Sequence, residues 1–162
     1  VPYYIRPSPP ITYSLKDSQD LYDKLTIDYN ELLNEVNSRS VFNFVVTAYH
    51  LIEWMKKDKR FAFGDIQDEI SEIKNHEYYK ICRDLANASK HFELRNPSKK
   101  VKSTSVSQGF GVGRYGAGPF GSGEEEVTIE LNDGRKIDIL ELAGGLMTIY
   151  DKYFTKSEID AK

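Results

Sequence analysis

Residues 41–57, which read VFNFVVTAYHLIEWMKK, decide the fold of this chain. Apolar side chains occupy nearly every turn of a helix drawn through them, so the helix has no continuous polar face. A helix that is apolar nearly all round lies at the centre of a bundle. We therefore expect it to be the most buried helix, with the following side chains largely inaccessible: Phe44, Val45, Ala48, Leu51, Ile52 and Met55.

Further helices are expected on both sides of this central one. Apolar residues recur three and four positions apart from Tyr22 to Val36, which predicts a helix from about residue 14 or 17 to residue 38. Gly64 and Asp65 indicate a break and an N-cap before a short helix that ends near residue 74. Another helix is predicted over about 76–92.

The C-terminal part combines strand and helix signals. Residues 124–131 alternate toward a strand, and Asn132-Asp133-Gly134 is a strong hairpin turn before a return strand through residues 137 and 139. A closing helix follows over about 140–154, although Gly144 and Gly145 lower its helix propensity. The fold class is therefore α+β and mainly helical: a helical bundle with a C-terminal β-hairpin and a closing helix.

Composition divides this one compact domain into four segments. Residues 1–13 form a proline-rich arm, because proline blocks helix at itself and just before itself. Residues 14–102 form the bundle, and residues 124–162 form the hairpin and closing helix. Between them, residues 103–123 form a glycine–aromatic arm built on the repeat aromatic, Gly, any, Gly, any. We expect its rings to anchor the arm in the domain's own groove or on a second subunit, or to stack on bases.

Charge and cysteine content limit the classes of protein. The net charge is −3, which argues against a generally basic nucleic-acid binder but leaves room for a local basic patch. The single cysteine, Cys82, cannot form an internal disulfide, which is typical of a reducing compartment and predicts a cytoplasmic protein. No secretory leader is seen. No stretch approaches the ~20 apolar residues that a membrane helix needs.

Polar side chains interrupt the apolar surface of the predicted central helix. Asn43, Thr47 and His50 fall on one stripe, with Glu53 beside it. Because an unpaired buried polar group costs about 1–3 kcal/mol, another helix must supply partners. One interpretation is a core histidine bonded to a neighbour. The other is a site in which His50 shuttles protons and Glu53 orients it.

The helix over 76–92 carries a second polar set within an arc of roughly 120°. Its members are Lys80, Arg83, Asp84, Asn87, Lys90 and His91. The set is either a solvated helix face or part of a pocket shared with His50 and Glu53. Such a pocket could hold a metal through His50, Glu53, Asp84 and His91, since mixed nitrogen and oxygen ligands suit Zn, Mn or Fe.

The alternative for this pocket is phosphodiester chemistry without a metal. A histidine would act on the 2′-hydroxyl or the leaving group, and an arginine or lysine would stabilise the phosphorane.

Helical-bundle metal sites place a His three residues after a Glu, whereas His50 precedes Glu53 here. We therefore expect neither a metal nor a cofactor.

The predicted helix over 76–92 carries a motif that resembles that of a known family. Arg83 is followed by the polar Asp84, and His91 comes after seven intervening residues. This resembles the HEPN superfamily, whose motif is arginine, usually a polar residue, and histidine after four to six intervening residues. The resemblance implies a mainly helical, often dimeric protein of a kind that often cuts RNA without metal in defence or toxin–antitoxin systems. Catalytically dead members act as binding modules.

A basic run follows this helix. Its cations are Lys90, Arg95, Lys99, Lys100 and Lys102. Such a run either attracts phosphates or is a solvated loop. In the arm, Tyr115 could stack on a base.

Two functional hypotheses follow from these candidates. The first is an RNA-processing or RNA-binding protein in which His91 shuttles protons and Arg83, Asn87 and Lys90 hold phosphate. The second is a non-catalytic helical interaction module that forms a homo-oligomer, of the kind that phages and mobile elements encode.

Overall fold

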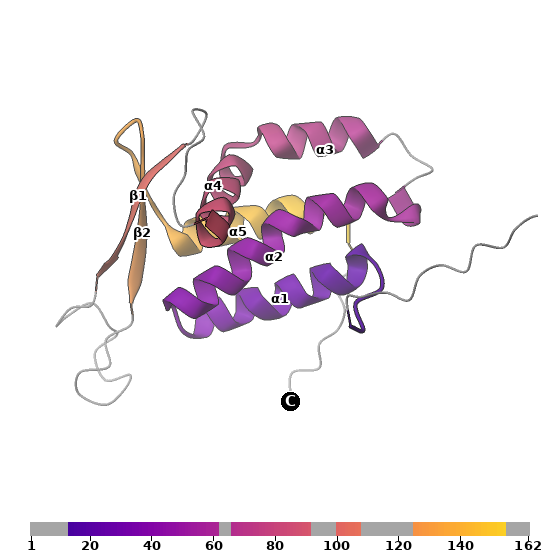
Figure 1. The fold of residues 1–162 in the computed structure, drawn as a ribbon, viewed down its shortest axis with the longest axis horizontal. Coiled ribbons are helices and arrows are strands. Elements are labelled where there is room, and N and C mark those ends of the chain that lie inside the picture. The colour runs from indigo at the N-terminus through magenta and orange to yellow at the C-terminus, as the bar shows by residue number, and fades with distance from the viewer. Residues whose placement is uncertain (1–12, 62–65, 92–99, 108–124, 155–162) are drawn as a thin grey trace, which may run out of the picture.

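The structure is a computed structural model that describes residues 13–61, 66–91, 100–107 and 125–154. Its helices are α1 (Ser18–Asn34), α2 (Ser38–Lys57), α3 (Ile66–Asn75), α4 (Glu77–His91) and α5 (Ile139–Tyr150), with a short 3-10 turn, η1 (Lys59–Phe61). The strands are β1 (Val101–Ser107), β2 (Glu126–Leu131) and β3 (Lys136–Asp138). The sheet stands at one end of the helical bundle (Figure 1). The expected fold class, mainly helical α+β with a closing helix, is confirmed.

The central helix is buried as its sequence predicted. All six of the expected core side chains of α2 are at most 1% exposed. Tyr150 of α5 donates a hydrogen bond of 2.7 Å to the Ala48 carbonyl, which holds the closing helix against α2. The helix is not buried all round, however. Phe42 is 49% exposed, and His50 and Glu53 are exposed as well.

Helix α1 ends four residues earlier than expected, at Asn34. The reason is local: Asn37 caps the next helix by accepting a hydrogen bond from the Ser40 N–H, and the Ser40 hydroxyl accepts one from the Asn37 N–H in return. This capping box fixes the start of α2 at Ser38 and excludes these residues from α1.

Thr47, the buried member of the α2 polar stripe, has its polar partners on α1, as the cost of burial required. The Thr47 hydroxyl donates to Asp28 Oδ2 at 2.6 Å, and Lys24 Nζ donates to the same oxygen at 2.6 Å. Thr47 and Asp28 are both buried, so this contact fixes the register of the two helices. Thr47 is therefore a packing residue.

The sheet has one strand more than the sequence analysis predicted. A two-stranded hairpin was expected, but β1 pairs antiparallel with β2 and gives the order β1-β2-β3. Strand β1 crosses the boundary at residues 102 and 103 that was expected to separate bundle from arm. Its serines and lysine resemble a loop, and only pairing with β2, some twenty residues later, makes them a strand. Ile139, expected in the return strand, begins α5.

Cys82 provides a probe of global stability. It is 0% exposed, its Sγ lies 3.4 Å from the Val45 carbonyl, and burial raises the pKa of its thiol. Only the thiolate reacts with disulfide reagents, so we expect no labelling of the native protein on a timescale of minutes and complete labelling in urea. Rapid labelling of the native protein by Ellman's reagent would contradict the packing of α4 on α2.

Candidate functional site

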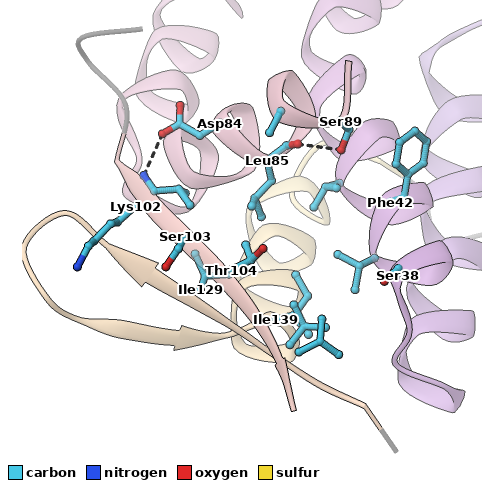
Figure 2. A pocket seen from close by; sticks show the side chains of 16 residues that line it. Ser38, Phe42, Asp84, Leu85, Ser89, Lys102, Ser103, Thr104, Ile129 and Ile139 are labelled. Carbon is cyan, nitrogen blue, oxygen red and sulfur yellow. Dashed lines mark hydrogen bonds between the residues drawn. The ribbon is translucent and has the colours of Figure 1, made fainter. Parts of the chain in front are cut away.

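A groove opens between the first turns of α2, the C-terminal half of α4 and the sheet (Figure 2). Its volume is about 470 Å³. The floor is made of buried apolar side chains from four elements, among them Val45, Ile129 and Ile139. The rim is made of less buried residues, among them Phe42 and Leu85. The groove is therefore an apolar surface that reaches from solvent to the core.

Two of the most exposed large apolar side chains in the described residues belong to this rim. Phe42 on α2 is 49% exposed and Val106 on β1 is 47% exposed. Thr104 also lines the groove, from the same face of β1 as Val106. The strand partners of these two residues, Ile129 and Val127, are both buried. Strand β1 thus continues the core face of the sheet beyond the cover that the helices provide.

One edge of β1 carries backbone groups that β2 does not use. The Leu131 N–H donates to the Arg135 carbonyl in the hairpin, whereas the Asn132 N–H donates to the Lys100 carbonyl. Because backbone groups alternate in direction along a strand, Ser103 and Ser105 bond to β2, and Thr104 and Val106 point their N–H and C=O groups outward. No described strand pairs with this outer edge.

Asp84 closes the other end of the groove, and its role is structural. The residue was expected on a solvated or site-facing arc, but it is 1% exposed. Its Oδ2 accepts hydrogen bonds from the backbone N–H groups of Lys100 and Val101, the latter at 3.2 Å. Its Oδ1 accepts from Arg83 Nε at 3.2 Å and from Nη2 at 3.1 Å. The carboxylate therefore ties the beginning of β1 to α4.

The other polar candidates of α4 and β1 are dispersed. Arg83 is partly buried and paired with Asp84, while Asn87 is partly buried and Lys90 is exposed near the end of α4. Lys100 is exposed, and its described contact to Asp84 is made by its backbone. Lys102 points away from the helices (Figure 2), and its Nζ lies 2.9 Å from Glu130 Oε1. Among the described members of the basic run, Lys102 is thus paired with an acid, and Lys90 and Lys100 are exposed.

His50 and Glu53 lie elsewhere, in a second pocket. It is formed by the last turns of α2 and the beginning of α1, and no residue of α4 lines it. The His50 ring is exposed and lies 5.4 Å from the ring of Tyr49. The Glu53 carboxylate is paired with Lys56 at 2.9 Å and Lys74 at 3.6 Å, and the hydrogen bond from Lys56 lowers the pKa of Glu53. The structure thus places His50 and Asp84 in two separate pockets.

Several candidates fall outside the described residues. These are Arg95, Lys99, Tyr115 and most of both arms, together with the expected cap at Gly64 and Asp65. His91 is the last residue of α4, and its side chain is not described. The catalytic roles expected for His91 and Arg83 stay predictions.

Within the described ranges, no group of three or more His, Cys, Asp or Glu side chains is placed to hold a metal ion. No helix there is long and apolar enough to cross a membrane. Every buried side-chain nitrogen or oxygen of the described part has a hydrogen-bond partner. The groove therefore offers a ligand an apolar surface and a strand edge, but no unpaired buried polar side chain.

The groove is the feature that sequence reasoning missed. The sequence did contain a signal for it. Thr104 and Val106 alternate as in a strand, and Phe42 lies on the side of α2 away from the six core residues. Neither residue type indicates a site by itself, because exposed single apolar side chains are common. Comparisons of the chain with protein-family models, with curated proteins and with solved structures found no match.

Proposed function

We propose that the protein is a non-catalytic interaction module that assembles with a second copy of itself through the groove and the outer edge of β1. The observation that carries this proposal is an uncharged strand edge with which no described strand pairs, on a strand whose core face is half exposed. Proteins protect an exposed strand edge with lysine, proline or a bulge. Here Lys102 and the bulge protect only the beginning of β1. Residues 103–107 carry neither charge nor proline.

Two identical strands can pair at this edge with two-fold symmetry. In an antiparallel pair centred on Ser105, Thr104 of one copy opposes Val106 of the other, and the two residues exchange backbone hydrogen bonds. Both side chains are β-branched and lie on the groove face, which is the type of cross-strand pair that stabilises a sheet. No like charges oppose each other in this register, since residues 103–107 are uncharged.

The groove supplies the apolar area that strand pairing alone lacks. A partner strand beside β1 would bring its own Thr104 and Val106 over the groove, where Phe42 and Leu85 form the rim. Burial of apolar surface contributes about 25 cal/mol per Å². Every buried side-chain nitrogen or oxygen of the described residues already has a hydrogen-bond partner, so an apolar occupant need not supply one to any of them.

The expected result is a dimer that loses stability when the groove rim is charged. The wild type should have a mass near twice 18.6 kDa by light scattering across a concentration series. Phe42→Asp should raise the dimer dissociation constant by about 100-fold, because the carboxylate would be buried unpaired at the interface. The matched control is Ile27→Asp on α1, since Ile27 is also 49% exposed but does not line the groove. This control should leave the mass unchanged.

The strand edge is tested separately by Thr104→Pro. Proline removes the outward N–H of residue 104 and leaves the bonds of Ser103 and Ser105 to β2 in place. The variant should be monomeric with a circular dichroism spectrum like that of the wild type.

A wild type that is monomeric throughout the series would refute the proposal and leave the groove to another occupant, such as residues 108–124 of the same chain. Equal effects of Phe42→Asp and Ile27→Asp would also refute it.

A further inference from the structure

The second pocket has a volume of about 470 Å³ and is lined by charged and aromatic side chains. His50, Trp54 and Lys57 come from α2, and they follow one another at spacings of four and three. Residues at these spacings share one face of a helix. Lys16 from the segment before α1 and Lys59 from η1 complete the wall on the other sides. The pocket thus combines two aromatic rings with three lysines.

The carboxylates of this pocket are already paired. Asp17 caps α1 by accepting from the Asp20 N–H at 3.0 Å. Asp58 accepts from the Ser18 N–H at 3.0 Å and the Arg60 N–H at 2.9 Å. Burial alone would raise the pKa of Asp58, but the hydrogen bonds from Ser18 and Arg60 outweigh it and lower the pKa. Both acids therefore accept hydrogen bonds from groups other than the three lysines.

The three lysines, in contrast, are accessible to an anionic ligand. The side chains of Lys16, Lys57 and Lys59 are exposed and have no ion pair within the described residues. Beside them, two ammonium groups share the single carboxylate of Glu53, since Lys56 and Lys74 both pair with it. Their nitrogens lie 2.9 Å and 3.6 Å from the same oxygen, Glu53 Oε1, and the neighbouring Lys56 lowers the pKa of Lys74. Three lysines and three acids line the pocket, so its excess of positive charge comes from Lys56 and Lys74 beside it, in a chain of net charge −3.

We propose that this pocket binds nucleotide phosphate, with the three lysines around the phosphate oxygens and Trp54 and His50 against the base. Ammonium groups bind phosphate as point charges, and aromatic side chains stack on any base because every base has a π-face. The same chemistry occurs in a free nucleotide and in single-stranded RNA. The proposal is independent of the dimer, because no residue lines both pockets.

The tryptophan makes the proposal directly measurable. Trp54 is the single tryptophan of the chain, so its fluorescence reports on this pocket alone. The full-length protein is titrated at low salt with inorganic phosphate, with adenosine monophosphate and with a ten-nucleotide single-stranded RNA. We expect quenching of Trp54 by the nucleotide or the RNA. If adenosine monophosphate and the RNA both bind, a free nucleotide is a sufficient ligand. If only the RNA binds, the phosphate that the pocket recognises belongs to a polymer.

The matched variants separate this pocket from general charge. Lys57→Gln with Lys59→Gln should weaken binding at least tenfold and, for the RNA, should reduce the salt slope by about 0.7 per lysine. The control is Arg39→Gln with Lys136→Gln, which removes the same charge from the first turn of α2 and from β3, outside the pocket. The control should bind like the wild type. Unchanged Trp54 fluorescence with all three probes, or equal weakening by both pairs, would overturn the proposal.

Discussion

Replacing Asp84 by alanine should lower the free energy of unfolding by about 3–5 kcal/mol, which is the usual cost of removing one partner from a buried ionic contact. The carboxylate is 1% exposed and accepts from two backbone N–H groups and from Arg83. Without it, the N–H of the buried Val101 and the partly buried guanidinium of Arg83 both lose this acceptor. The measurement is urea unfolding of the purified protein followed by circular dichroism.

Asp84→Asn tests whether the acceptor capacity matters rather than the shape. An amide has one acceptor oxygen and one donor nitrogen, so it can satisfy either the two N–H groups of β1 or Arg83. We expect a loss of about 1–3 kcal/mol, between the wild type and alanine. Asp68→Asn, on the exposed surface of α3, is the control and should change stability by less than about 0.5 kcal/mol. An alanine variant as stable as this control would show that β1 does not depend on Asp84.

Two adjacent glycines in α5 should respond in opposite directions to the same substitution. A Cβ at Gly145 would overlap the ring of Tyr78, whereas a Cβ at Gly144 would lie 3.5 Å from the Tyr29 hydroxyl, an ordinary contact. Gly144→Ala should therefore stabilise the protein by up to about 1 kcal/mol through helix propensity. Gly145→Ala should destabilise it by about 1–3 kcal/mol, because overpacking displaces the ring.

A double-mutant cycle isolates the contact between α4 and α5. The Tyr78 hydroxyl donates to Glu141 Oε1 at 3.3 Å, so the ring lies across the glycine and is held at both ends. In a Tyr78→Ala background, Gly145→Ala should no longer destabilise, which would give a coupling energy of about 1–3 kcal/mol. If both alanine variants stabilised the protein equally in the wild-type background, the close packing of Tyr78 on α5 would be wrong.

The sequence alone was sufficient for the helices and most of the core. Apolar side chains at spacings of three and four report a helix because the helix itself sets that period, whatever lies around it. The apolar pattern of α2 identified its six core residues. The residue types of Asn132-Asp133-Gly134 identified the hairpin turn, in which Gly134 has φ of +87°. The need of Thr47 for a partner was also visible, although which residue of α1 would supply it was not.

Tertiary structure decided where the polar residues act. The helix period places Asp84 on the same arc as Lys80 and Asn87, but a period cannot state that residues 100 and 101 return to cover that arc and bury the carboxylate. It likewise cannot state that His50 faces α1 while Asp84 faces β1. Strand β1 exists because β2 pairs with it, so its edge and the groove beside it are properties of a long-range contact. Local patterns fixed the helices because their hydrogen bonds are local, and the candidate sites required the packing of elements far apart in the chain.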